Sequence, residues 1–152
     1  MAKKEIMTDL WVYDMLKEIG VQNDFSAQGS NIREIDEALA TASKKGTGKV
    51  GFPEYVGVIN DFLVVIEDKA SLNKHLNRDE NNLIAEDVKS VTDYAVNGAL
   101  FYGKHLAKNT TYKKIIAIGV SGNEKNHKIS PLFVDERGGY NELNDVETFI
   151  IW

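Results

Sequence analysis

Residues 51–69 limit what this chain can fold into more than any other stretch. Its second half holds the unbroken apolar run 63–66, Leu-Val-Val-Ile, which is rich in β-branched residues and typical of a buried strand. Asn60 and Asp61 come before that run and form a turn signal. The stretch therefore predicts two strands joined by a tight turn, the second of which is buried.

Three charged residues lie at the ends of these two predicted strands. Glu54 begins the first strand, whereas Glu67 and Lys69 end the second. Side chains on a strand alternate between faces, so Glu67 and Lys69 point the same way and Asp68 points the other way. In a hairpin that turns at residues 60–61, Glu54 faces Glu67 or Asp68. Unpaired buried charge is strongly unfavourable, so charges at the end of a buried strand indicate a chemical use.

The chemistry that suits these residues is hydrolysis of a phosphodiester. Two carboxylates at one end of a sheet repel each other unless a cation lies between them, and oxygen ligands favour Mg²⁺ over zinc. The side chain of Lys69 can orient a water molecule or, as the neutral amine, deprotonate it, and its ammonium form can stabilise a negatively charged transition state. The alternative is a solvated cross-strand ion pair, which Glu-x-Lys often forms. The apolar run before Glu67 argues against that alternative.

Pro53-Glu54 followed by Glu67-x-Lys69 resembles the motif of the PD-(D/E)xK nuclease superfamily, with Glu replacing the more usual first Asp. The resemblance covers about residues 5–135. Several segments in this range resemble, in the same order, the N-terminal nuclease domain of restriction–modification enzymes. These enzymes are the R subunits of type I systems and the fused type IIG proteins. The similar segments are residues 31–45, 48–55, 65–69, 93–102 and 115–122.

This resemblance implies a restriction-endonuclease-like α/β (α+β) fold, with a mixed central sheet flanked by helices. It implies a Mg²⁺-dependent endodeoxyribonuclease, in which Mn²⁺ can replace Mg²⁺. Glu54, Glu67 and the backbone carbonyl of Asp68 would bind the metal, and Lys69 would position or activate water. Nucleases of the superfamily often add an acid from the first helix, and Glu34 is the candidate by that comparison. A surface charge is the alternative interpretation of Glu34.

Length and charge add expectations about domains and partners. A chain of 152 residues predicts a single nuclease domain over residues 1–152, and the apolar ending suggests an N-terminal fragment of a larger protein. The net charge of −5 is unlike that of a plain nucleic-acid binder. DNA contact is expected from the local cluster Lys44, Lys45 and Lys49, for which a solvated loop is the alternative. Expected partners are double-stranded DNA and the remaining domains or subunits, with dimerisation on DNA.

The sequence also bears on where the protein works. It has no cysteine, hence no disulfide and no thiolate zinc site. The N-terminus lacks the apolar region of a signal peptide, and no apolar run approaches the roughly 18 residues that span a membrane. We therefore expect a cytoplasmic protein with no membrane partner.

Periodicity and turn signals predict the remaining elements. Helices are expected at residues 6–19, 31–43 and 85–106, strands at 113–120 and 129–134, and loops at 22–30 and 71–83. The order helix–helix–strand–strand–helix–strand–strand gives a mixed sheet with flanking helices.

Several polar and aromatic residues receive separate interpretations. The three histidines lie in polar surroundings and are expected at the surface: His75, His105 and His127. Asn97 and Tyr102 lie near the place where type I nucleases carry a Gln-x-x-x-Tyr motif, without matching it. Tyr102 is interpreted as a core or half-buried aromatic residue.

Two other functions stay open from sequence alone. A repair or recombination nuclease of the same superfamily, such as a Holliday-junction resolvase, would use the same residues, but such enzymes are usually basic. A non-catalytic interaction module could keep the fold without the chemistry. The presence of Glu54, Glu67 and Lys69 together argues against such a module.

Overall fold

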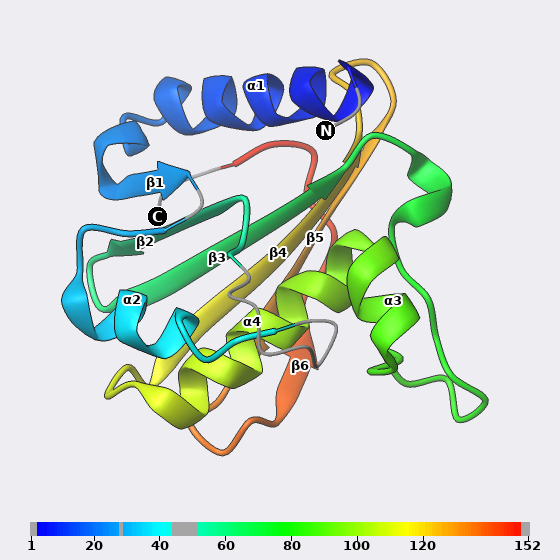
Figure 1. Ribbon diagram of the computed structural model, residues 1–152. Coiled ribbons are helices and arrows are strands. Elements are labelled where there is room, and N and C mark those ends of the chain that lie inside the picture. The colour runs from blue at the N-terminus through cyan, green and yellow to red at the C-terminus, as the bar shows by residue number, and fades with distance from the viewer. Residues whose placement is uncertain (1–2, 28, 44–51, 150–152) are drawn as a thin grey trace.

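The computed structural model describes residues 3–27, 29–43 and 52–149. In this part of the chain a mixed sheet of six strands runs in the order β1-β2-β3-β4-β5-β6 (Figure 1). Strand β3 pairs in parallel with β4, and all other neighbours pair antiparallel. The strands are β1 (Phe25–Ala27), β2 (Tyr55–Ile59), β3 (Phe62–Lys69), β4 (Lys114–Gly122), β5 (His127–Val134) and β6 (Tyr140–Glu142). The expected fold class is confirmed.

The hairpin predicted at residues 51–69 forms as strands β2 and β3. Ile59 pairs with Phe62 and Tyr55 pairs with Ile66, so the turn lies at residues 60–61 as expected. Asn60 adopts a left-handed conformation with φ of 55°, which asparagine tolerates better than most residues. The short turn therefore fixes the register that brings Glu54 beside Glu67.

Helices cover both faces of the sheet (Figure 1). Helix α1 (Lys3–Glu18) lies on one face, and α2 (Arg33–Leu39), α3 (Val88–Asp93) and α4 (Ala95–Asn109) lie on the other. Strand β3 supplies residues to both layers: Leu63 and Val65 pack in the cluster with α4, whereas Val64 and Ile66 pack in the cluster with α1. A strand covered on both faces reads as a continuous apolar run, which explains residues 63–66.

The long helix expected at residues 85–106 is divided into α3 and α4. Tyr94 between them has an extended backbone, with φ of −115° and ψ of 138°. The backbone N–H of Val96 donates to the carbonyl of His75, at 2.8 Å. The segment predicted as the loop 71–83 contains the 3₁₀ helix η2 (Leu72–Lys74). The start of α4 is therefore hydrogen-bonded to the residue that follows η2.

The sequence analysis predicted neither the two shortest strands nor the two 3₁₀ helices. Strands β1 and β6 have three residues each, and the 3₁₀ helix η1 (Gln22–Asp24) precedes β1. Three residues are too few to show the period-2 alternation that identifies a strand. Pairing with β2 and β5 therefore decides their conformation.

Helix α4 packs unusually close to β4 at one point. A Cβ atom added to Gly119 would lie 2.6 Å from the backbone nitrogen of Val96, so only glycine fits there. Gly119 is the partner of Glu67 in the parallel β3–β4 pair. The first turn of α4 therefore lies over the end of β3 that carries the predicted catalytic residues. In the described ranges, no helix combines the length and apolar character needed to cross a membrane.

Candidate metal and catalytic site

The β2–β3 hairpin joins the first two predicted site residues. The backbone N–H of Glu54 donates to Oε1 of Glu67 at 2.9 Å. Glu67 is 3% exposed, and Tyr102 of α4 lies near it. Burial first, and then the negative charges of Glu67 and Glu54, raise the pKa of the Tyr102 hydroxyl far above its usual range. Tyr102 is buried as predicted, and it forms one wall of the space around Glu67.

Three carboxylates converge at the end of β3 on the side of α1. Oxygens of Asp9, Glu54 and Asp68 all lie within 4.8 Å of one another, which makes these residues the one such group in the described part of the chain. We call them the acid group. Asp9 comes from α1, Glu54 from the residue before β2, and Asp68 from β3. Two strands and one helix therefore have to assemble before the acid group exists.

The acid group is electrostatically strained without a counter-ion. Asp68 is only 4% exposed. Its burial, its contact with Asp9, and the charges of Asp9, Glu54 and Glu67 raise the pKa of its carboxyl group. Oδ2 of Asp68 and Oδ1 of Asp9 are buried with no hydrogen-bond partner among the described residues. Buried acceptors that lack donors, in an all-oxygen ligand set, suit a hard divalent cation such as Mg²⁺.

Two hydrogen bonds hold α1 where Asp9 can reach the sheet. The Tyr55 hydroxyl donates to the backbone carbonyl of Asp9 at 2.9 Å, and the Thr8 hydroxyl donates to the carbonyl of Gly122 at 2.9 Å. Burial and the nearby carboxylates, Asp9 foremost, raise the pKa of Tyr55 well above its ordinary value. The Tyr55 hydroxyl therefore stays protonated and keeps donating at neutral pH.

Asp9 is the site residue that sequence reasoning missed. The sequence held one signal for it: Asp9 lies three and seven residues before Val12 and Leu16, which are both buried against the sheet. Residues at this spacing share a helix face, so Asp9 is a carboxylate in line with an apolar stripe.

Glu34, the predicted first-helix ligand, lies elsewhere. Its carboxylate accepts hydrogen bonds from the backbone and hydroxyl of Thr111. Thr111 precedes the first residue of β4, Lys114, which pairs with Phe62 at the opposite end of β3 from Glu67. The structure therefore places Glu34 at the far end of the sheet from the acid group.

Lys69 and Glu67 share the α4 face of β3, and Asp68 occupies the opposite face. Lys69 is half-buried and pairs with Ser121 of β4. Glu54 connects the two sides, since its backbone binds Glu67 and its carboxylate belongs to the acid group. Asp68 contributes its side chain to that group, whereas its backbone carbonyl as a ligand remains a prediction. Lys44, Lys45 and Lys49 lie outside the described residues.

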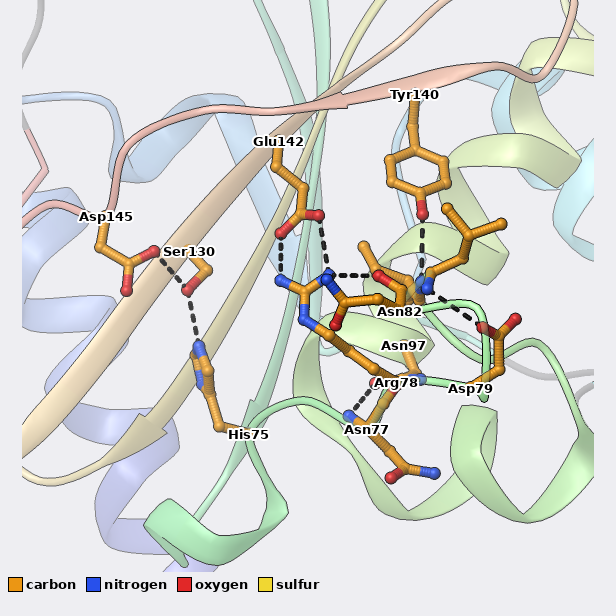
Figure 2. A network of polar contacts seen from close by, with 12 residues as sticks. His75, Asn77, Arg78, Asp79, Asn82, Asn97, Ser130, Tyr140, Glu142 and Asp145 are labelled. Carbon is orange, nitrogen blue, oxygen red and sulfur yellow. Dashed lines mark hydrogen bonds and ion pairs between the residues drawn. The ribbon is translucent and has the colours of Figure 1, made fainter.

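His75 corrects another expectation, because it is buried rather than at the surface. It is 5% exposed. Its Nδ1 lies 2.8 Å from Oγ of Ser121. Its Nε2 lies 2.6 Å from Oγ of Ser130, as Figure 2 shows. Burial lowers its pKa to about 4. Polar neighbours in sequence gave no signal of this, because the groups that enclose His75 come from β4 and β5.

Asn97 has a structural role on the adjacent stretch of chain. Its side chain accepts from the backbone N–H of Asn77 and donates to the carbonyls of Asn77 and Ala85. Figure 2 shows Asn97 beside Asn77 and the ion pair of Arg78 with Glu142 nearby. Asn97 therefore fixes the segment after η2 to α4.

Comparison with known proteins supports a relation to restriction enzymes. Over 138 residues, which is 90% of this chain, the sequence is 35% identical to the type II restriction enzyme and methyltransferase RM.BcgI of Heyndrickxia coagulans. The match spans 21% of the length of that protein. No protein-family model matches the chain, and no solved structure matches it. The chain is thus related to a restriction–modification protein that is about five times longer than the matched region.

Proposed function

We propose that this chain is a Mg²⁺-dependent endodeoxyribonuclease domain of a restriction–modification protein. The acid group carries the proposal: it is an all-oxygen set with two unsatisfied buried oxygens, and Glu54 links it to Glu67 on the other face of β3. The relation to a type II restriction enzyme supports DNA as the substrate. It also favours a type II parent over the type I alternative.

In this proposal Asp9, Glu54 and the side chain of Asp68 hold Mg²⁺, and Mn²⁺ can replace it. A bound divalent cation stabilises charge on a phosphodiester and lowers the pKa of a coordinated water. Glu67 accepts the Glu54 N–H and thereby sets the direction of Glu54. Glu67 remains the alternative ligand, since the PD-(D/E)xK resemblance assigns it to the metal.

In this proposal Lys69 keeps the catalytic role expected from sequence. Its ammonium, half-buried at the end of β3, can orient the attacking water or donate to the phosphoryl oxygens. Hydrolysis breaks a P–O bond of the backbone while an oxygen of water bonds to phosphorus. The proposed partners are double-stranded DNA, the remaining parts of the restriction–modification protein, and a second copy on DNA when both strands are cut.

A plasmid-nicking assay tests the reaction. Supercoiled plasmid is incubated with the wild-type chain or with Lys69→Ala or Glu54→Gln, in Mg²⁺ or Mn²⁺. Removing a general acid–base or charge-stabilising group costs about 10²- to 10⁴-fold in rate, so both variants should lose nicking. Glu34→Gln is the matched control and should retain it. Equal nicking by wild type and Lys69→Ala would overturn the assignment of Lys69.

Titration calorimetry with Mn²⁺ separates the two ligand sets. If the acid group binds the metal, Asp9→Asn and Asp68→Asn each weaken binding strongly. Glu67→Gln then has a smaller effect, because its carboxylate supports Glu54 from the other face. Loss of binding in Glu67→Gln with full binding in Asp9→Asn would instead favour the set of Glu54 and Glu67.

A further inference from the structure

Two lysines lie in one row across the α4 face of the sheet, beside the candidate site. Lys69 of β3 pairs with Ser121 of β4, and Ser121 pairs with Lys128 of β5. Residues opposite each other on neighbouring strands share a face, and the strands are about 4.8 Å apart. The Cα atoms of Lys69 and Lys128 are therefore about 10 Å apart. Lys128 is exposed.

A third lysine, Lys74, precedes His75, whose ring is hydrogen-bonded to Ser121 in the middle of this row. The Ser130 hydroxyl donates to Oδ1 of Asp145 at 2.7 Å (Figure 2), so its oxygen must accept from Nε2–H of His75. Nδ1 is then the acceptor, and Ser121 donates to it. The imidazole is thus bound by directed hydrogen bonds to both β4 and β5. It anchors the end of η2, whose last residue is Lys74.

The side chain of Lys74 is exposed, and its position is further defined by α4. Its Nζ lies 5.2 Å from the ring centroid of Tyr94, the residue that precedes α4. A cavity of about 490 Å³ opens on the same face, with His75 and Ser130 in its wall and Lys128 at its side. Lys128 therefore lines this cavity, and Lys74 adjoins His75, another of its lining residues. We call Lys74 and Lys128 the lysine platform.

In the part of the chain that the structure describes, several cations already have a carboxylate partner, whereas the two lysines of the platform do not. Arg33, Arg78, Lys89, Lys104 and Lys113 each pair with a carboxylate. Lys74 and Lys128 form no ion pair within the described ranges, so their charges are available. The acids near the cavity already accept hydrogen bonds, Glu142 from Arg78 and Asp145 from Ser130.

We propose that Lys74 and Lys128 bind phosphates of the DNA backbone where the duplex extends beyond Lys69 across β4 and β5. This inference rests on the proposed nuclease function. A chain with a net charge of −5 needs a local cationic surface to bind DNA. Lysine contacts to phosphate position a duplex without reading its bases. The platform therefore contributes sequence-independent affinity and sets the direction of the DNA relative to the site.

Fluorescence anisotropy with a labelled DNA duplex and the full chain tests the platform. EDTA is present, so binding is measured without cleavage or metal. Lys74→Ala and Lys128→Ala should each raise Kd about three- to tenfold near 100 mM salt. Each should also reduce the slope of log K against log salt by about one. The effects should be the same on duplexes of unrelated sequence.

Lys114→Ala is the matched control. Lys114 is also an exposed lysine beside an aromatic ring, with Nζ 5.7 Å from the centroid of Phe62, but it lies at the opposite end of β4. It should leave Kd and the salt slope unchanged. If Lys74→Ala and Lys128→Ala behave like Lys114→Ala while the wild type binds and nicks DNA, the platform alone is overturned. A wild type that neither binds the duplex nor nicks plasmid would overturn both proposals.

Discussion

The Tyr55 hydroxyl donates a 2.9 Å hydrogen bond to the backbone carbonyl of Asp9. This bond joins β2 to α1 at the residue that supplies the helical acid of the candidate site. The two residues are far apart in the sequence, so the position of Asp9 depends on tertiary contacts. Its removal should disturb the acid group without touching a carboxylate.

Tyr55→Phe should lower the free energy of unfolding by about 1 kcal/mol, the usual value of a buried hydrogen bond. It should also weaken Mn²⁺ binding, because α1 is less firmly fixed. Chemical denaturation with and without Mn²⁺ measures both effects. Tyr140→Phe is the control, since the Tyr140 oxygen accepts from the Ile84 N–H away from the acid group. If Tyr140→Phe weakened Mn²⁺ binding as much as Tyr55→Phe does, this account of Tyr55 would be contradicted.

Asp68→Asn should have opposite effects with and without metal. Without metal, burial and the acids Asp9, Glu54 and Glu67 raise the pKa of Asp68, so the wild type at neutral pH has to take up a proton there when it folds. The neutral amide avoids that cost, so the variant should unfold at higher denaturant. With Mn²⁺ at about 100 times the wild-type Kd, the wild type should gain about 2.7 kcal/mol, and the variant should gain little.

Glu34→Gln provides the matched comparison for Asp68→Asn, since Glu34 contacts Thr111 instead of the acid group. It should keep the full stabilisation by Mn²⁺. If Asp68→Asn gains as much stability from Mn²⁺ as the wild type does, the acid group does not bind metal.

His75 should make stability fall in mild acid. Burial lowers its pKa to about 4 from 6.5, opposed by the charge of Asp145 and assisted by that of Lys128. The unfolded chain then binds a proton that the folded chain does not bind. Stability from this group is complete above pH 6.5 and decreases as the pH falls from 6.5 toward 4, by up to about 3 kcal/mol.

Urea unfolding between pH 7.5 and 4.5 measures the effect of His75. His75→Gln should be less stable at pH 7.5, because its amide cannot reproduce both hydrogen bonds, and its stability should vary less with pH. His105→Gln serves as the control and should keep the wild-type slope. An unchanged slope in His75→Gln would show that other groups cause the loss.

Gly119→Ala should destabilise the protein by about 1–3 kcal/mol, the usual cost of overpacking. The added Cβ would lie 2.6 Å from the backbone nitrogen of Val96, so the first turn of α4 has to move. Thermal unfolding measures the loss. Gly103→Ala is the comparison: its nearest atom is a side-chain carbon of Val134 at 3.1 Å, and the gain in helix propensity offsets part of the crowding.

Local sequence was sufficient to predict the β2–β3 hairpin and to place the charged residues at its ends. The apolar run, the turn at residues 60–61 and strand alternation together placed Glu54 beside Glu67. These features depend on neighbours within a few residues, where sequence patterns are informative. The register was therefore predictable without knowledge of the rest of the fold.

The positions of Asp9, Glu34 and His75 could not be predicted from sequence, for a common reason. Each depends on which distant element packs against it: β2 and β3 for Asp9, the start of β4 for Glu34, and Ser121 with Ser130 for His75. Helical periodicity shows that a residue faces the core, but not which end of the sheet it meets. Polar neighbours in sequence likewise do not exclude burial of a histidine whose partners are strand hydroxyls.

The acid group also has a consequence for the order of folding. Glu54 and Asp68 belong to one hairpin and can approach each other early, since local contacts form quickly. Asp9 joins them only when α1 has docked on the finished sheet, through Tyr55 and Gly122. A nascent or partly unfolded chain therefore lacks the third carboxylate. Complete folding becomes a precondition for assembling the site, which keeps incomplete chains from presenting it.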